Sequence, residues 1–252
     1  MCLKVKKWVG LALWLGLLAG AAAPVKAAGL MVYGPGGPLA PMQECASLFA
    51  QAQGLAVTVT AGPEENWIQK ARQDADLIFG GAEYMLSLFM LKNPGLVEEK
   101  TVASLWIRAA GVLVRKQNPK AIKSLKDLSQ PGIRLLDVAG AGQLGMWEDL
   151  AGKQGLIPGL RRNIAVTAPH TAAGIQQWKD RPELDAWINF ASWHWRLKEI
   201  TDLVPIPKEQ TVYRGTPVAI TSICRQKPTA LKFIGFLKTP KAHEVFKKWG
   251  WE

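Results

Sequence analysis

A glycine-rich turn at residues 140–145, with the sequence GAGQLG, constrains the fold most strongly. It follows an apolar stretch at 133–139, typical of a buried strand, and precedes a helical pattern at 146–154. The spacing G-x-G-x-x-G is the fingerprint of dinucleotide-binding folds, but the acidic residue expected about 20 positions later is missing. We therefore expect no cofactor. The turn instead predicts a helix N-terminus whose backbone N–H groups bind an anion.

The rest of the chain alternates between strand-like and helix-like segments. Strand patterns at 29–33, 56–60 and 76–79 alternate with helical patterns at 42–53, 66–73 and 83–91, and a similar alternation runs from 110 to 249. This order predicts an α/β fold, with mixed or parallel sheets covered by helices. A strand, a glycine-rich turn and a helix occur at 30–49 and again at 133–153. Two lobes that face each other would bring both helix N-termini to one ligand.

The first 27 residues have the pattern of a cleavable export signal. Three lysines precede an apolar stretch from Trp8 to Ala23, and a small residue, Ala27, ends the segment. A transmembrane anchor is the weaker alternative, because the stretch is short and runs into Pro24. We therefore predict a signal peptide at 1–27 and a periplasmic protein.

The charge of the exported chain favours acidic ligands. The whole sequence has a net charge of +11, and residues 1–27 hold four lysines and no acidic residue, so residues 28–252 carry +7. Basic residues do not alternate with aromatic ones in a stripe, and an exported protein rarely meets nucleic acid. We therefore expect no nucleic-acid partner.

The sequence lacks the patterns of an enzyme or a metal site. The three histidines have no metal-ligand spacing, and no G-x-S-x-G elbow occurs. The adjacent carboxylates at 64–65 and 148–149 point different ways on a helix, so they are not an acid/base couple. We predict neither catalysis nor a bound metal. Cys45 and Cys224 remain after export, and they either form a disulfide or stay as buried thiols.

Several short segments, taken together, resemble the accessory colonisation factor (AcfC) family. They are MVYGPGGP at 31–38, TAGP at 60–63 with Trp67, DLIF at 76–79 with EYM at 83–85, the turn at 140–145 with WED at 147–149, and FKKWGW at 246–251. The resemblance covers essentially all of the chain after residue 27. That family belongs to the periplasmic solute-binding proteins of the molybdate- and sulfate-binding type.

The resemblance implies a type II periplasmic binding protein with two α/β lobes and a ligand cleft between them. Lobe I would comprise 28–109 and 213–252, lobe II 110–212, with hinges near 108–111 and 211–216. The implied ligand is a small anion, such as sulfate, a phosphorylated small acid or a citrate-like carboxylate, delivered to an ABC transporter or a sensor. Some relatives are dimers or surface antigens. A homodimer and a surface-exposed colonisation factor or adhesin are therefore further expectations.

The candidate ligand-binding residues lie in the turns and near the lobe crossings. Gly36 and Gly37 open the first helix, and residues 142–145 play the matching role in lobe II. Arg108 and Arg214 can grip an oxyanion or form salt bridges, and both alternatives stay open. The full set is Gly36, Gly37, Gly62, Trp67, Gly81, Arg108, Gly142, Gln143, Gly145, Asn189, Tyr213, Arg214 and Thr216. At 80–82 the chain reads Gly-Gly-Ala where the resemblance implies hydroxyl side chains, which would change the anion that fits.

Overall fold

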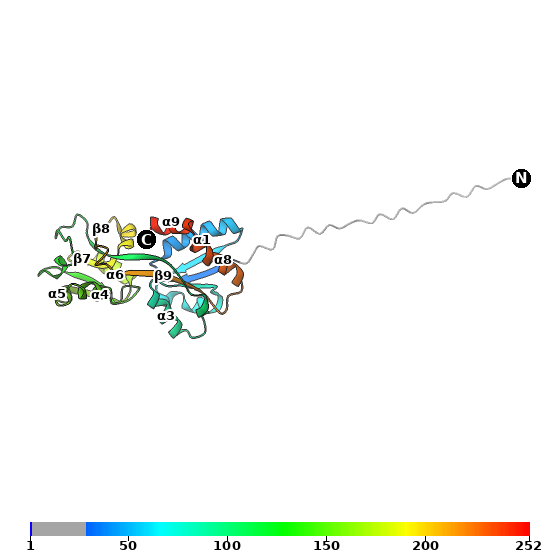
Figure 1. Cartoon of the computed structure of the whole chain (residues 1–252), viewed down its shortest axis with the longest axis horizontal. Helices are drawn as coiled ribbons and strands as arrows, with labels where there is room; N and C mark the ends of the chain where they lie inside the picture. Colours follow the sequence, from blue (N-terminus) through cyan, green and yellow to red (C-terminus); the bar gives the residue numbers. More distant parts are fainter. Residues whose placement is uncertain (2–28) are drawn as a thin grey trace.

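The protein was analysed as a computed structural model that describes residue 1 and residues 29–252. The predicted signal peptide therefore lies outside the described residues, apart from its first residue. Two α/β halves lie side by side, and β9 runs between them (Figure 1). We call them lobe I, which holds β1 to β3, and lobe II, which holds β5 to β8. Within the described residues, no helix is long and apolar enough to cross a membrane.

Lobe I is built on three parallel strands. The central strand β1 (Leu30–Gly34) pairs with β2 (Val57–Ala61) and with β3 (Leu77–Phe79). The intervening and following helices are α1 (Leu39–Gln53), α2 (Ile68–Asp74) and α3 (Glu83–Lys92). The last two helices of the chain, α8 (Lys227–Leu237) and α9 (Pro240–Lys248), return to this lobe and pack against α1. Phe49, Phe233 and Phe246 are buried in the shared core.

Lobe II repeats this plan with a second sheet. Strand β5 (Leu135–Val138) lies between β6 (Ile164–Ala168) and β7 (Ala186–Phe190), parallel to both. Its helices are α4 (Met146–Gly152), α5 (Ile157–Asn163), α6 (Thr171–Asp180) and the single turn α7 (His194–Leu197). Two fully buried tryptophans, Trp178 and Trp187, occupy its core. The strand–turn–helix units predicted at 30–49 and 133–153 are present as β1–α1 and β5–α4.

Two long antiparallel strands join the lobes. Strand β4 (Ala103–Arg115) pairs with β9 (Tyr213–Ile220) up to Ala109, then with β7 from Ala110 and with β8 (Thr201–Pro205) from Gly111. Since β9 also pairs with β3, one hydrogen-bonded path runs through both lobes. The change of partner after Ala109 leads us to propose the lobe boundaries at 109/110 and 212/213.

The structure extends or corrects several sequence predictions. The strand predicted at 110–115 begins at Ala103, because its first half pairs with β9. The helices α5 and α7 were missed because each is too short to show a period. Of the two alternatives for the cysteines, the structure shows free thiols: Cys45 is buried in lobe I and Cys224 is half-buried beside the same core.

Candidate functional site

A cavity of about 690 Å³ lies between the lobes. Lobe I contributes the turns after β1, β2 and β3 together with one side of α3, and lobe II contributes the turns after β5 and β6 together with α7. All five turns follow the carboxyl ends of parallel strands, which is where open α/β sheets bind ligands. The cavity is therefore the candidate site.

Three helices begin at this cavity. Residues 36, 37 and 39 line it at the start of α1, residues 80 and 84–86 at the start of α3, and residues 169–172 at the start of α6. The first N–H groups of a helix have no partner within the helix and carry partial positive charge. His170 caps α6, because its Nδ1 accepts a hydrogen bond of 3.1 Å from the Ala173 N–H. The cavity is thus surrounded by fixed dipoles that favour an anion.

Arg108 is the one site candidate that brings a full positive charge to the junction of the lobes while fully buried. It lies on β4 just before the strand changes partner, and none of its surface is exposed. Its Nη2 donates to the carbonyl oxygen of Gly81 at 2.5 Å, and its guanidinium stacks 3.7 Å from the ring of Phe190. Nε and Nη1 have no hydrogen-bond partner, and Arg108 forms no salt bridge among the described residues. Burial lowers the pKa of Arg108 to about 9.

Three glycine turns surround this guanidinium. A Cβ atom placed on Gly37 would lie 2.9 Å from Nη1 of Arg108, and one on Gly81 or Gly142 would lie 3.4 Å from Nη2. Gly142 also has a φ of +88°, which other residues rarely adopt, and faces the Gly81 carbonyl across the lobe boundary. We call Gly37, Gly81 and Gly142 the glycine cradle. The three cradle glycines and Arg108, all four predicted from the sequence as ligand-binding residues, therefore lie next to one another.

Three polar contacts join the lobes, two of them at the cavity and the third at a separate opening. Tyr84 Oη of α3 accepts a hydrogen bond of 3.2 Å from the Leu144 N–H. Arg196 Nη1 of α7 donates to the Gly36 carbonyl oxygen at 2.8 Å. Arg214 of β9 pairs with Asp149 of α4 at 2.7 Å. The two lobes are therefore in direct contact with each other in this structure.

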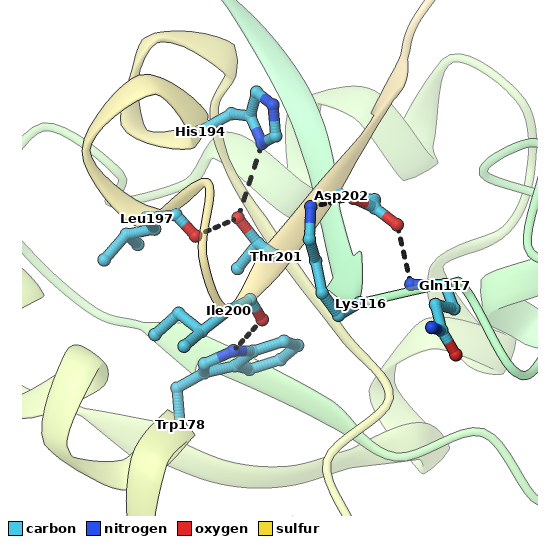
Figure 2. Close-up of polar contacts among 8 residues, drawn as sticks. All are labelled: Lys116, Gln117, Trp178, His194, Leu197, Ile200, Thr201 and Asp202. Atoms are coloured by element: carbon cyan, nitrogen blue, oxygen red, sulfur yellow. Dashed lines mark hydrogen bonds and ion pairs between the residues drawn. The ribbon is translucent and has the colours of Figure 1, made fainter.

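A polar network holds the segment that carries Arg196 (Figure 2). Thr201 Oγ1 donates to the Leu197 carbonyl oxygen at 3.0 Å and lies 3.4 Å from His194 Nδ1. Trp178 donates from Nε1 to the Ile200 carbonyl oxygen at 3.3 Å. These bonds fix α7 to β8 and α6. The backbone of Arg196, which lies on α7, is therefore held in position. Burial lowers the pKa of His194, and nearby Lys116 lowers it further.

Four other predicted residues lie at the cavity: Gly36, Gly62 and Trp67 line it, and Gln143 lies behind it. Gln143 is buried, and its side chain accepts from Trp187 Nε1 and donates to Thr171 Oγ1, both at 3.0 Å. Trp67 lines the cavity with a buried ring and donates from Nε1 to the Gly62 carbonyl oxygen at 3.2 Å. Gly62 and Gly36 line the cavity as well. Gln143 therefore holds the turn at 140–145 in place through its side chain.

Five predicted residues lie elsewhere. Gly145 precedes α4 without lining the cavity, and Thr216 accepts a hydrogen bond from Trp251 Nε1 at 3.0 Å. Tyr213 and Arg214 line a separate opening beside Asp149. Asn189 is fully buried on β7, where Oδ1 accepts from the Phe190 N–H and Nδ2 has no partner.

Sequence reasoning missed Tyr84, His170 and Arg196 as site residues. Tyr84 was read only as part of a family segment, and Arg196 lies in a helix of four residues without a period. The signal that could have found His170 is its position just before a helical pattern, where N-caps occur. No group of three or more possible metal ligands was found in the part of the chain that the structure describes.

The comparisons with known proteins agree with this geometry. Residues 30–252 match the family described as bacterial extracellular solute-binding protein. The chain belongs to this family. The match confirms the resemblance to solute-binding proteins drawn from the sequence. None of the curated proteins matches the sequence at a significant level.

Solved structures show the same fold. PEB3 from Campylobacter jejuni is 30% identical, with a TM-score of 0.81 over 88% of this chain and 99% of that one, and PEB3 has also been crystallised with L-phospholactate bound. The sulfate-binding protein SubI from Mycobacterium tuberculosis H37Rv is 17% identical, with a TM-score of 0.74 over 89% and 86% of the two chains. The molybdate-binding protein of Azotobacter vinelandii is 18% identical, with a TM-score of 0.69 over 88% and 98%. The predicted two-lobed α/β fold is thereby confirmed.

The contact between Tyr84 and Leu144 makes a prediction about how firmly the lobes meet. In Tyr84→Phe the Leu144 amide loses its acceptor, and a hydrogen bond of this kind contributes about 0.5–1.5 kcal/mol. We expect the protection of the Leu144 amide from hydrogen exchange, followed by NMR without ligand, to fall roughly 2- to 12-fold. Tyr213→Phe is the control, because the Tyr213 hydroxyl has no hydrogen-bond partner in the described part of the chain. Equal protection in all three proteins would show that this bond does not hold the lobes together.

Proposed function

We propose that the protein binds a small anion in the cleft between the lobes and delivers it to the permease of an ABC transporter. Arg108 carries this proposal. A buried cation with two unpaired nitrogen atoms, Nε and Nη1, and no carboxylate partner is costly, by several kcal/mol in real proteins. A bound oxyanion would supply both the missing charge and the missing acceptors. The three helix N-termini around the cavity act in the same direction.

The relatives support an anionic ligand. PEB3, at 30% identity, has been crystallised with L-phospholactate, which carries a phosphate and a carboxylate. The more distant SubI and the Azotobacter protein are named for sulfate and molybdate. These ligands share tetrahedral oxyanion chemistry, which suits a cradle of backbone N–H groups around one guanidinium.

The proposal assigns binding and no catalysis. The site brings together glycines, two arginines, a lysine, the carboxylates of Glu64 and Glu65, a tyrosine hydroxyl that already accepts a bond, and a capping histidine. None of these forms a nucleophile–base pair. Export to the periplasm by the segment 1–27 and assembly into a homodimer remain parts of the proposal. The adhesin alternative is not favoured, since the cleft geometry and the family point to solute binding.

Replacing Arg108 with methionine should abolish most of the affinity for the anion. Hydrogen bonds to charged groups contribute about 1.5–3 kcal/mol, so the dissociation constant should rise roughly 10- to 150-fold. The measurement is isothermal titration of the exported protein with sulfate, molybdate, phosphate, citrate and L-phospholactate, after refolding from denaturant to remove acquired ligand.

The matched control for this titration is Arg162→Met. Arg162 is exposed at the end of α5 and lies outside the cavity lining. The Arg162→Met variant should bind the anion as tightly as the wild type, because it removes one positive charge from the surface and leaves the cavity unchanged. Equal affinity of the Arg108 variant and the wild type would refute the role of Arg108 as the anchor of the anion. No binding of any anion by the wild type would refute the proposed anion-binding function.

Gly37→Ala should weaken binding without unfolding lobe I. The new methyl group would lie 2.9 Å from Nη1 of Arg108, in the space where the anion meets the guanidinium. We expect at least about a tenfold loss of affinity, the value of one good charge-assisted hydrogen bond. Gly235→Ala in α8 is the control, because its added Cβ meets open space. Full affinity in the Gly37 variant would place the anion elsewhere.

A further inference from the structure

The cavity is much larger than its anchor for the anion. Of Arg108 and the glycine cradle, only Gly37 lines the cavity, and Arg108 lies directly behind it, whereas the volume of about 690 Å³ is typical of pockets that hold drug-sized molecules. A bare tetrahedral oxyanion would fill only a small part of this space. The remainder must hold either water or a further part of the ligand.

Apolar side chains from both lobes form the walls of this remaining space. They are Leu39, Trp67, Met85 and Leu88 from lobe I, and Ile175 and Trp193 from lobe II. Three of them, Leu39, Met85 and Ile175, are only partly covered, and Leu88 is 44% exposed. A partly covered apolar side chain at a cavity wall gains free energy when an apolar ligand excludes water from it.

Several of the polar side chains along the cavity are already engaged within the protein. Tyr84 Oη accepts from the Leu144 N–H, His170 Nδ1 accepts from the Ala173 N–H, and Thr171 Oγ1 accepts from Gln143. Arg196 donates to the Gly36 carbonyl oxygen. Tyr84 and Thr171 can each still donate one hydroxyl proton, and the charged side chains that also line the cavity, Glu64, Glu65 and Lys92, carry no hydroxyl. The turn at 80–82, Gly-Gly-Ala, adds no hydroxyl either.

The space is not a gap left by separated lobes. Tyr84 and Leu144, Arg196 and Gly36, and Arg214 and Asp149 already bridge the lobes. The cavity persists beside these contacts. It also follows α3, of which six residues between Tyr84 and Lys92 line it, and this stretch of α-helix rises by about 12 Å.

We propose that the ligand is an organic anion with one acidic head group and an apolar body, bound with its head at Arg108 and its body along α3. This rests on the proposed function and adds the class of substrate. A phosphonate, sulfonate or carboxylate head would meet the guanidinium and the glycine cradle. An alkyl chain or an aromatic ring would cover Met85, Leu88 and Ile175.

The test is a series of ligands that share one head group and differ in the body. Methyl-, butyl-, hexyl- and phenylphosphonate are titrated into the refolded exported protein, with inorganic phosphate as the bare anion and phosphoglycerate as the hydroxylated body. We expect the affinity to rise roughly fourfold for each added methylene, the factor that corresponds to about 0.8 kcal/mol per buried CH₂. Phosphoglycerate should bind more weakly than butylphosphonate.

A pair of variants on α3 locates the apolar body. Met85→Gln replaces a wall residue by a polar one of similar size and should reduce the gain per methylene by at least half. Met90→Gln is the matched control, because Met90 lies on the same helix outside the cavity lining. The Met90→Gln variant should show the same gain in affinity per methylene as the wild type.

The outcomes separate the two proposals. Tight binding of inorganic phosphate with no gain along the series overturns the apolar-body proposal and leaves anion binding intact. A stronger response to phosphoglycerate than to butylphosphonate overturns it as well. No binding by any member overturns both proposals. A rising series in the wild type that is unchanged in Met85→Gln overturns the placement of the body along α3.

Discussion

The buried guanidinium of Arg108, without a counter-charge, is the constraint on which the rest of the site depends. Removing an ion from water costs several kcal/mol unless a partner of opposite charge and good geometry compensates. The protein supplies the Gly81 carbonyl oxygen and the ring of Phe190, and it leaves Nε and Nη1 unpaired. The fold therefore keeps a charge in place at a cost that a bound anion can offset.

The architecture explains how this charge reaches the junction of the lobes. Arg108 lies on β4, the strand that leaves the lobe I sheet at Ala109 and enters the lobe II sheet at Ala110. A residue at this crossing contacts both lobes. The glycine cradle allows the turns of both lobes to approach the guanidinium, since a Cβ at Gly37 would collide with it. A ligand bound here would contact both lobes, so its affinity and the closure of the lobes are coupled.

The sequence predicted the elements that depend on local patterns. The turns at 34–38 and 140–145 follow apolar strands and precede helices, and both line the cavity. Arg108 could be proposed because it stands beside the strand at 110–115, although its burial could not be foreseen. Arg214 had an equal claim, and the sequence holds no signal for its pairing with Asp149, 65 positions away. The role of Arg196 could not be predicted from the sequence, because its position depends on the packing of a single helical turn against β8 and α6.

The most direct test of this account is the free energy of unfolding of the ligand-free wild type and of Arg108→Met, measured by urea titration after refolding. The methionine variant leaves the Gly81 carbonyl oxygen unpaired, which costs about 1–3 kcal/mol, but it removes a buried charge that costs several kcal/mol. The account therefore predicts that the variant is more stable than the wild type without anion and less stable at saturating anion. A variant that is less stable under both conditions would show that Arg108 is a structural support and not the anchor of a ligand.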